Sequence, residues 1–398
     1  MMDASLFISR RLRFRGNIAV ISIAISFLVM IIAVAVSSGF RHQLRSGIAR
    51  ISGDIQIVPP DMNPLDPAQP VERDAAYVDA VASIDGVASV IPVVYRAGIV
   101  KSGTDVHGVL FKGVPDGPSS VTGEPCQDSL ALQIAIPERL SEITGIGVGD
   151  RMLTYFVGDN VKLRQFNVTA TYDPLVQTDD RLVVYCSLSD LQRVDGWGPQ
   201  QVSAMEIMLD ESHSDEASIN EAVEHVGAYV NAYSSDSEAL VIAVSSLQKY
   251  PQLYDWLNLL DFNVFFILLL MTAVAGFNMI SGLLIMLFEN IPVIGLLKAL
   301  GMKNWNISRI FLSSSAVLVA KGMIAGNLIA FAFCIIQNAT HVLKLNPENY
   351  FVSYVPVHID FASVILADIA VFAVVMVLLL IPCMFIYRVD PAETVRMK

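Results

Sequence analysis

The residues best suited to nucleophilic or metal chemistry are six histidines and four cysteines, and their spacing supports neither chemistry. The histidines are scattered, and no Cys-x-x-Cys, His-Glu-x-x-His or Gly-x-Ser-x-Gly pattern occurs, so neither a zinc site nor a nucleophile elbow is indicated. Gly-Lys-Ser and Gly-Lys-Thr are missing as well, so the phosphate-binding loop of a nucleotide hydrolase is not indicated. The sequence predicts no catalytic residue, no metal site and no enzyme activity.

Two charged residues lie in chemically demanding surroundings. Lys321 and Asp368 each fall inside a long apolar stretch, where a charge costs roughly 2.5 to 3.5 kcal/mol and is usually paired. We predict a structural ion pair between them, although their depths differ by roughly 12 Å at about 1.5 Å per helical residue. Independent snorkelling of the two side chains is the alternative, and proton coupling is a more distant one.

Four apolar stretches are long enough to cross a bilayer, because roughly 20 helical residues span about 30 Å of hydrocarbon. They cover residues 17–38, 262–288, 310–336 and 361–387. They account for a chain that is 54% hydrophobic and 16% charged, against roughly 25% charged residues in soluble proteins. A soluble enzyme is therefore not expected, and a net charge of -12 argues against a nucleic-acid binder.

The charge distribution predicts the topology. Residues 1–40 carry a net charge of +3, residues 41–261 carry -17, and residues 262–398 carry +2. The positive-inside rule places residues 1–16, 289–309 and 388–398 in the cytoplasm, and residues 39–261 and 337–360 outside. A cleaved signal peptide is the alternative for the first span, but its 19-residue apolar run exceeds the roughly 7 to 15 residues of such signals.

The external segment 39–261 mixes short strand and helix patterns. Alternating runs such as residues 90–95 predict strands, and residues 75–84, 137–144 and 219–225 predict helices. We therefore expect an α-helical integral membrane protein with four transmembrane helices and a large α+β domain inserted between helices 1 and 2. Cys126 and Cys186 fall in this external segment, where one disulfide and two buried thiols are equally compatible with the spacing.

The short connection between the second and third spans predicts an amphipathic helix. Ile294, Leu297 and Lys298 recur at helical spacing, and Gly301 is suited to end the helix. Asn304 or Asn306 could cap the helix that follows. Such a helix could insert its apolar side into a groove of a cytoplasmic partner, or it could lie on the lipid surface.

Four segments at the membrane junctions carry a family pattern. They are Ser38–Leu44 (SGFRHQL), Ala273–Ile280 (AVAGFNMI), Ile294–Gly301 (IGLLKALG) and Asp390–Arg396 (DPAETVR). With these motifs the chain resembles the FtsX/MacB-like permeases, and most closely the permease subunits of lipoprotein-releasing (Lol) ABC transporters. The resemblance implies a MacB-like core domain over residues 39–261 and an FtsX-like permease domain over residues 262–398.

The resemblance implies an inner-membrane subunit that binds no cofactor itself. Its partners would be a second permease chain, identical or different, and two copies of a cytoplasmic ABC ATPase that holds ATP and Mg. The substrate would be an acylated lipoprotein, extracted from the membrane and passed to a periplasmic chaperone. A MacB-like mechanotransmission permease and an FtsX-like regulator of cell-wall hydrolases are the alternatives.

The resemblance also assigns a set of residues to ATPase coupling, and two departures from the family qualify it. The family often has Glu immediately before the Ile-Gly pair, where this chain has Val293. The stretch that matches the chaperone-binding hook of some Lol permeases, Val157–Arg164, is short, so this chain looks like the subunit without a hook. The residues assigned to coupling are Glu289, Ile294, Gly295, Leu297, Lys298 and Gly301.

Large, flexible and uncharged side chains would suit a path for acyl chains, and the first two spans offer them near their external ends. Ordinary helix-packing or lipid-facing surface is the alternative at each position. The residues assigned to this path are Phe27, Met30, Val34, Phe40, Leu259, Phe262, Phe266 and Met271.

Overall fold

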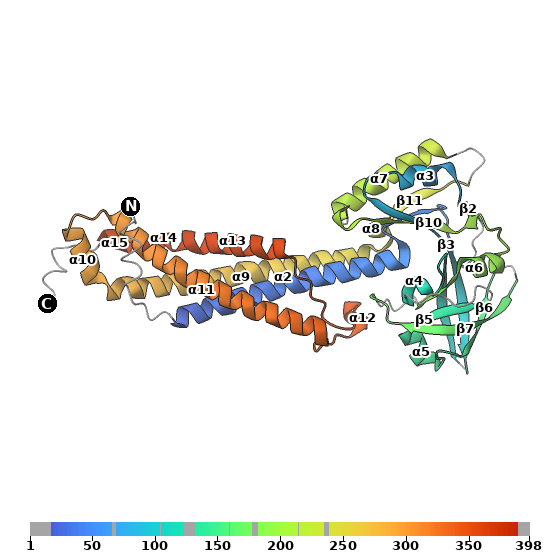
Figure 1. Cartoon of the computed structure of the whole chain (residues 1–398), viewed down its shortest axis with the longest axis horizontal. Coiled ribbons are helices and arrows are strands. Elements are labelled where there is room, and N and C mark those ends of the chain that lie inside the picture. Colours follow the sequence, from blue (N-terminus) through green and yellow to red (C-terminus); the bar gives the residue numbers. More distant parts are fainter. Residues whose placement is uncertain are drawn as a thin grey trace. The chain divides into compact units, whose positions relative to one another are not determined.

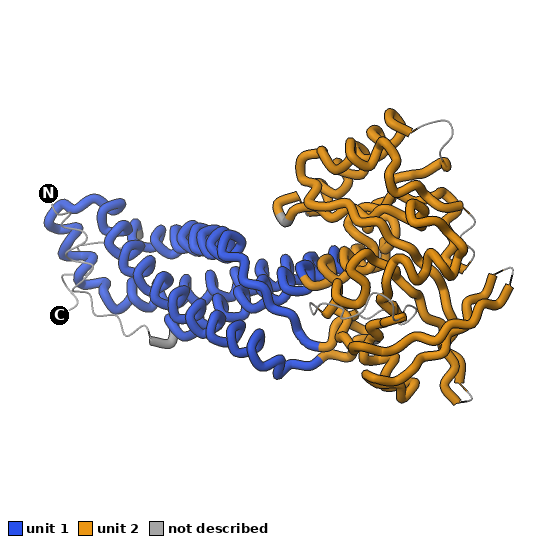
Figure 2. The backbone as a smooth tube through the Cα atoms, turned by 45° about the vertical axis from the view of Figure 1, so that its right-hand side comes forward, with its two compact units in different colours: residues 1–42, 256–344, 354–398 blue, residues 43–255, 345–353 orange. Residues whose placement is uncertain are grey.

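The computed structural model describes residues 17–65, 69–103, 105–122, 132–158, 160–176, 182–213, 215–234 and 239–388. The chain divides into two compact units, coloured separately in Figure 2. Unit 1 comprises residues 1–42, 256–344 and 354–398, and unit 2 comprises residues 43–255 and 345–353. Each unit is described separately below.

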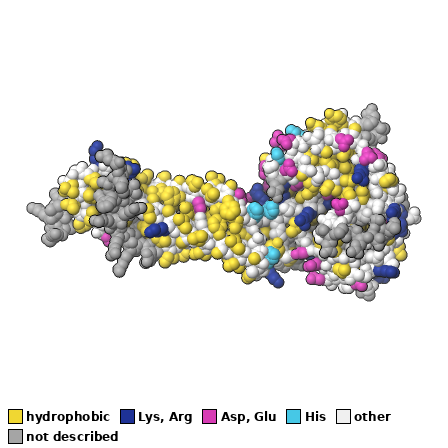
Figure 3. Space-filling view, viewed as in Figure 1, with side chains coloured by type: hydrophobic (Ala, Val, Ile, Leu, Met, Phe, Trp, Pro, Cys, Tyr) yellow, Lys and Arg dark blue, Asp and Glu magenta, His cyan; other side chains and the backbone are white. Residues whose placement is uncertain are grey.

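Unit 1 is built from long apolar helices. Four of them are long and apolar enough to cross a membrane, as the sequence predicts. They are α2 (Asn17–Ser52), α9 (Pro251–Glu289), α11 (Asn304–Thr340) and α13 (Phe361–Leu378), the last extended by the short helices α14 (Leu380–Cys383) and α15 (Phe385–Arg388). Helix α10 (Ile291–Ala299) connects α9 to α11 (Figure 1). On the face shown in Figure 3, hydrophobic side chains cover the surface of these helices.

Small residues allow α11 to approach α2 closely. Gly322 and Gly326, four residues apart, both lie buried on α11. A Cβ atom at Gly326 would lie 2.5 Å from the carbonyl oxygen of Ala24, and one at Gly322 would lie 2.6 Å from Cγ2 of Ile23. Glycine is therefore required at both positions, as in the small-xxx-small packing of membrane helices.

Unit 2 has two halves that share strand β3 (Val87–Ser102). In the first half, the strand order is β11-β1-β10-β3 and every neighbouring pair is antiparallel. With one helix after β1 and one after β10, this is a split βαβ arrangement of the ferredoxin-like type. Its other elements are β1 (Ile55–Val58), α3 (Ala76–Ala82), β10 (Ala204–Leu209), α7 (Glu216–Tyr233) and β11 (Ile242–Ser245).

The second half is a closed barrel inserted between β3 and β10. The order β3-β4-β8-β5-β7-β6 is closed by a pairing of β6 with β3, at Ile99↔Tyr155 and Val100↔Thr154. Phe111, Phe156 and Phe166 fill the interior, with ring centroids 5.1 to 6.2 Å apart. The strands are β4 (Asp105–Val114), β5 (Gln133–Pro137), β6 (Arg151–Phe156), β7 (Lys162–Tyr172) and β8 (Leu182–Ser187).

The structure confirms the α+β class of the inserted domain. The predicted helices over residues 75–84, 137–144 and 219–225 correspond to α3, α5 (Glu138–Thr144) and α7, and α7 is much longer than predicted. Strands β6 and β7 pair up to Phe156↔Lys162, so only residues 157–161 connect them. The remaining elements are β2 (Val71–Glu72), α4 (Ser119–Thr122), α5 (Glu138–Thr144), α6 (Leu188–Asp195), β9 (Gln201–Val202), η1 (Glu211–His213), α8 (Ser246–Lys249) and α12 (Pro347–Tyr350).

Candidate functional site

Helix α10 is held against the other helices of unit 1 by several of the residues that the sequence assigns to coupling. Ile294 and Gly295 are buried, and Nζ of Lys298 donates a hydrogen bond of 2.6 Å to the carbonyl oxygen of Ile386. Gly301 ends the helix with φ +85°, and its N–H donates to Lys298 while that of Met302 donates to Leu297, which is a Schellman motif. The predicted glycine cap is thus confirmed, whereas α11 is preceded by Lys303 and the predicted asparagine cap is wrong.

The most exposed apolar side chains of α10 and the start of α11 belong to residues that were not predicted from the sequence. Leu296, Leu300 and Trp305 are 57%, 75% and 61% exposed. Trp305 also lines a shallow groove with Lys303 and Tyr387. Leu296 and Leu300 are four residues apart, so their side chains lie on one side of the helix. This spacing is the sequence signal that could have indicated an exposed apolar face of α10. Among the predicted coupling residues, Glu289 and Gly301 are exposed.

The structure does not place the eight predicted path residues on one surface. Phe27 and Met30 are buried in the helix core of unit 1, where Met271 packs against the same cluster. Phe40 is buried with its ring centroid 5.3 Å from that of Trp256. Three residues of α9 point outward, and Val34 is half-buried. The exposed residues are Leu259, Phe262 and Phe266.

The predicted ion pair between Lys321 and Asp368 is wrong. Nδ2 of Asn327, further along α11 than Lys321, instead donates a hydrogen bond of 2.5 Å to Oδ2 of Asp368. Lys321 is exposed on α11. Asn327 lies on the same helix as Lys321 and reaches Asp368, whereas the Lys321 side chain is on an exposed face of that helix. Within residues 239–388, Oδ1 of both Asn327 and Asp368 has no hydrogen-bond partner.

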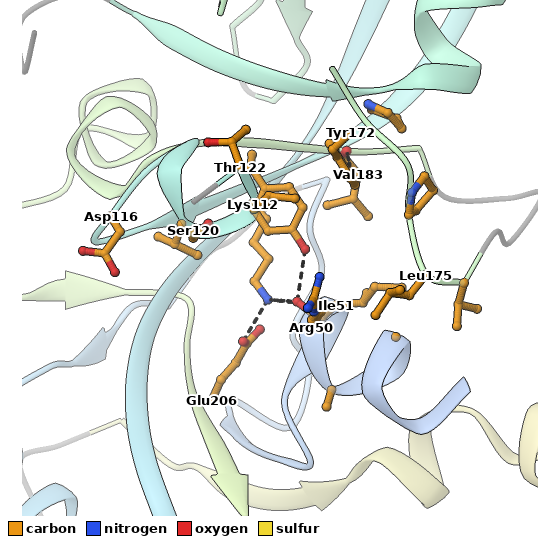
Figure 4. A pocket seen from close by; sticks show the side chains of 18 of the residues that line it. Arg50, Ile51, Lys112, Asp116, Ser120, Thr122, Tyr172, Leu175, Val183 and Glu206 are labelled. Carbon is orange, nitrogen blue, oxygen red and sulfur yellow. Dashed lines mark hydrogen bonds and ion pairs between the residues drawn. The ribbon is translucent and has the colours of Figure 1, made fainter. Parts of the chain in front are cut away.

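In unit 2, the end of helix α2 is bound by a buried lysine. Nζ of Lys112, on β4, donates hydrogen bonds to the carbonyl oxygens of Arg50 at 2.7 Å and Ile51 at 3.0 Å, the last turn of α2. The same ammonium lies 2.8 Å from Oε2 of Glu206, on β10 (Figure 4). Lys112 and Glu206 are only 2% and 3% exposed. All three ammonium protons are therefore used, and the positive charge lies at the negative end of the helix dipole.

Two tyrosines complete this group, which we call the α2 clamp: Lys112, Glu206, Tyr95 and Tyr185. The Tyr185 hydroxyl donates to the carbonyl oxygen of Arg50 at 3.1 Å, and the Tyr95 hydroxyl contacts Glu206 and lies 2.8 Å from the carbonyl oxygen of Ile51. Burial raises the pKa of both hydroxyls, with the Glu206 carboxylate acting in the same direction. Both therefore remain neutral donors, and one helix end is fastened to strands β3, β4, β8 and β10.

A cavity of about 780 Å³ adjoins the α2 clamp within unit 2. Residues of both halves line it, including Ile91 of β3, Tyr172 of β7 and Val183 of β8. Lys112 and Glu206 of the α2 clamp line it as well (Figure 4). Nothing in the sequence pattern marked this cavity, because its walls come from segments far apart in the chain.

Cys186 is a free, fully buried thiol, whose pKa burial raises. The other external cysteine, Cys126, lies outside the described residues. Among the residues that the structure describes, no group of three or more His, Cys, Asp and Glu side chains is arranged to hold a metal ion.

Comparison with protein families identifies the class of this chain. Residues 18–229 match the family model of the MacB-like periplasmic core domain, and residues 265–391 match the FtsX-like permease C-terminal domain. The two matches define a permease of the ABC transporters, which work with an ATPase and a second permease subunit. The chain belongs to the MacB-like periplasmic core domain family and carries an FtsX-like permease domain. Its four apolar helices fit a bacterial inner-membrane protein with a periplasmic domain.

Curated relatives align with nearly the whole chain at low identity. The lipoprotein-releasing system transmembrane protein LolC of Xylella fastidiosa is 21% identical over 407 residues, covering 95% of this chain and 92% of that protein. LolC of Neisseria meningitidis is 20% identical over 410 residues, covering 95% and 93%. LolE of Haemophilus influenzae is 22% identical over 416 residues, with the same coverage.

Two solved structures similar to this chain are external domains of transporters. The periplasmic region of MacB from Actinobacillus actinomycetemcomitans is 11% identical, with a TM-score of 0.32 over 52% of this chain and 95% of that one. The extracellular domain of the transporter YknZ from Gram-positive bacteria is 13% identical, with a TM-score of 0.30 over 48% and 99%.

Proposed function

We propose that this chain is a permease subunit of an ATP-driven transporter that extracts acylated lipoproteins from the inner membrane for transfer to a periplasmic chaperone. It would act with a second permease chain and two copies of a cytoplasmic ATPase, with both of its termini in the cytoplasm. Alignment of 95% of the chain with LolC supports this substrate class, because LolC is named for lipoprotein release.

The observation that carries the mechanism is the continuity of α2 and the way it ends. Its 36 residues form one helix, about 54 Å long at about 1.5 Å per residue, whereas bilayer hydrocarbon is about 30 Å thick. Its last turn is fastened by the α2 clamp to four strands. In this proposal, movement of the permease helices on ATP binding is transmitted through α2 as a rigid rod to the periplasmic domain.

The ATPase would bind to the exposed residues of α10 and the start of α11. Leu296, Leu300 and Trp305 offer apolar anchors of the kind that insert into a groove of a partner. Lys298 and Gly301 fix the helix that presents two of them. The predicted coupling residues would thus position the docking surface, and the exposed ones would touch the ATPase.

Depletion of the protein, followed by membrane fractionation, tests the substrate class. We expect lipoproteins to accumulate in the inner membrane within a few generations. If they reach the outer membrane at normal levels, lipoprotein release is not the function. A loss of drug or peptide efflux in that case would point to the MacB-like alternative, and a defect in cell separation to the FtsX-like one.

The docking surface is tested by the variant Leu296→Glu/Leu300→Glu. An acidic side chain in an apolar groove costs several kcal/mol, so co-purification of the ATPase should fall by about tenfold or more. The control is Val342→Glu, an acidic substitution at an exposed apolar residue that follows α11. If the ATPase co-purifies equally with both variants, the exposed face of α10 is not its binding site.

A further inference from the structure

The cavity beside the α2 clamp has the size and lining of a binding site. Its volume of about 780 Å³ falls within the roughly 300 to 1,000 Å³ typical of ligand pockets. Apolar side chains from several segments line it, among them Val90, Ile91, Val121, Leu175 and Val183. Figure 4 places Leu175 and Val183 with Thr122 and Tyr172 around the same hollow.

The charges around the cavity are balanced, which restricts the chemistry of an occupant. Three basic residues line it, Arg50, Lys112 and Arg139, as do three acidic ones, Asp116, Asp173 and Glu206. Such a lining favours neither a polyanion such as a phosphorylated headgroup nor a polycation. It matches a neutral ligand that has hydrogen-bond donors, acceptors and apolar groups together.

An open strand edge runs along one wall. Residues 87–93 of β3 pair with β10 on one side, whereas β4 pairs with β3 only from Val94 onward. Among the described residues, the edge of 87–93 opposite β10 is therefore unpaired. Ala88 and Ser89 on this stretch are exposed and Val90 and Ile91 are half-buried, whereas Pro92, which has no N–H to donate, and Val93 are buried, so the accessible part of the edge is residues 87–91. An unpaired strand edge is a template for another strand, and β4, the neighbour of β3 on this side, ends at Val114.

We propose that the cavity binds an extended peptide that adds as a strand along residues 87–91 of β3. The occupant is the flexible tether that joins the acyl anchor of a lipoprotein to its folded part, so the inference rests on the proposed function and names a second contact with the same substrate. Strand addition recognises the backbone and tolerates varied side chains, as substrates that share only an acylated end require. Four to six residues would cover roughly 13 to 20 Å of the edge at about 3.3 Å per residue.

The site also explains how a substrate could influence the transporter. Lys112 and Glu206 of the α2 clamp line the cavity, so a bound tether lies against the fastening of α2. Binding of the tether could therefore change the contacts that hold the end of α2, a helix that also crosses the membrane.

Photocrosslinking to the full chain in lipid nanodiscs tests the proposal. The probe is a capped peptide of about ten alternating Ser and Val residues with one central benzoylphenylalanine, prepared with and without a diacylated N-terminal cysteine. We expect mass-spectrometric mapping to place the crosslinks of both forms on residues 87–91 or 114–116. Methylation of alternate backbone nitrogens, which prevents strand pairing, should lower the yield at least about fivefold. Leu175→Trp, which fills the cavity, should do the same, whereas Val148→Trp, at an exposed residue outside it, should not.

The outcomes separate this inference from the proposed function. Crosslinks of the diacylated probe that fall only on α2 and α9 would overturn the peptide site and leave lipoprotein release standing. Crosslinks in the cavity that resist backbone methylation, or a photoactivatable fatty acid that labels it instead, would overturn strand addition. Labelling of the cavity as expected, in a protein whose depletion leaves lipoprotein sorting normal, would support a peptide site and refute the proposed substrate class.

Discussion

Replacing Lys112 by methionine should strongly destabilise the periplasmic domain. The variant keeps the length of the side chain but leaves the Glu206 carboxylate, 3% exposed, without its cation. It also removes the donor to the carbonyl oxygens of Arg50 and Ile51. Removing one partner of a buried ion pair costs about 3 to 5 kcal/mol, so unfolding should shift by roughly 6 to 20 °C for a domain of this size.

The unfolding of this domain can be followed through Trp197, the one tryptophan of unit 2 among three in the chain. In a background where Trp256 and Trp305 are phenylalanine, the fluorescence of the full chain in detergent reports Trp197 alone. Lys101→Met serves as the control, because Lys101 is exposed on the same sheet and should cost less than about 0.5 kcal/mol.

A second variant tests whether the destabilisation of Lys112→Met comes from the unpaired Glu206 carboxylate. Adding Glu206→Gln to Lys112→Met removes the unpaired buried carboxylate, so the double variant should be more stable than Lys112→Met alone. A Lys112→Met protein that unfolds within about 1 kcal/mol of the unmodified chain would refute the reasoning. The reasoning would also be refuted if Glu206→Gln destabilised the Lys112→Met protein as much as it destabilises the unmodified chain.

Three further changes test other contacts. Gly326→Ala should destabilise helix packing by about 1 to 3 kcal/mol, because its Cβ atom would clash with the backbone of α2. Gly276→Ala is the control and should be tolerated, because its Cβ atom would contact only the flexible end of the Leu378 side chain. Equal thermal stability of the two variants in detergent would contradict this expectation. Asp368→Asn should be at least as stable as the unmodified chain, since a second amide can donate a hydrogen bond to Oδ1 of Asn327. Asp368→Leu should lower the free energy of unfolding by about 1 to 3 kcal/mol, because it leaves Asn327 without a hydrogen-bond partner. Lys321→Met should leave the stability unchanged in the same assay. Burial raises the pKa of Asp195 to about 6 against the opposing effect of Arg96, so the folded state binds more protons than the unfolded one between about pH 4 and 6, and stability falls as pH rises through that window. Asp195→Asn should reduce the total loss of unfolding free energy across this pH window by about 1 to 2 kcal/mol, after allowance for solvent screening. The same pH dependence in the variant and the unmodified chain, followed by fluorescence-detected unfolding from pH 4 to 7.5, would count against this expectation.

The sequence was sufficient for features that depend on local composition. Span positions follow from apolar length, and the end of α10 follows from Gly301, because a left-handed residue after a helix favours glycine. The α+β class of the inserted domain likewise follows from short alternating runs. These properties are set within windows of ten to twenty residues, in which one chain segment contains all the information.

Contacts between distant segments were not accessible in this way. Lys112, Glu206 and Tyr185 lie on three strands separated by long stretches of chain, and as isolated residues in a sequence they resemble any exposed lysine, glutamate or tyrosine. The Lys321–Asp368 prediction failed for the same reason, since the depth of each charge can be counted along the chain but the rotation of its helix cannot. Asn327 was overlooked because an uncharged amide in an apolar stretch is a weaker signal than a charge.

The buried charged groups of this chain differ in how many of their hydrogen-bond donors and acceptors have partners. That difference predicts how much each group contributes to stability. Lys112 uses every ammonium proton, which is what a fixed fastening requires, because any movement of the end of α2 relative to the strands would break several hydrogen bonds at once. Arg96 and Asp195 approach at 3.4 Å, yet Nε of the first and Oδ2 of the second have no hydrogen-bond partner among the described residues. A pair of this kind gains little from ionisation, which is why burial prevails over Arg96 in the pKa of Asp195. Loss of charge should therefore be severe at Lys112 and mild at Asp195, although both residues are buried and paired. If the two substitutions cost the same, hydrogen-bond satisfaction is not what distinguishes the fastening of α2 from its surroundings.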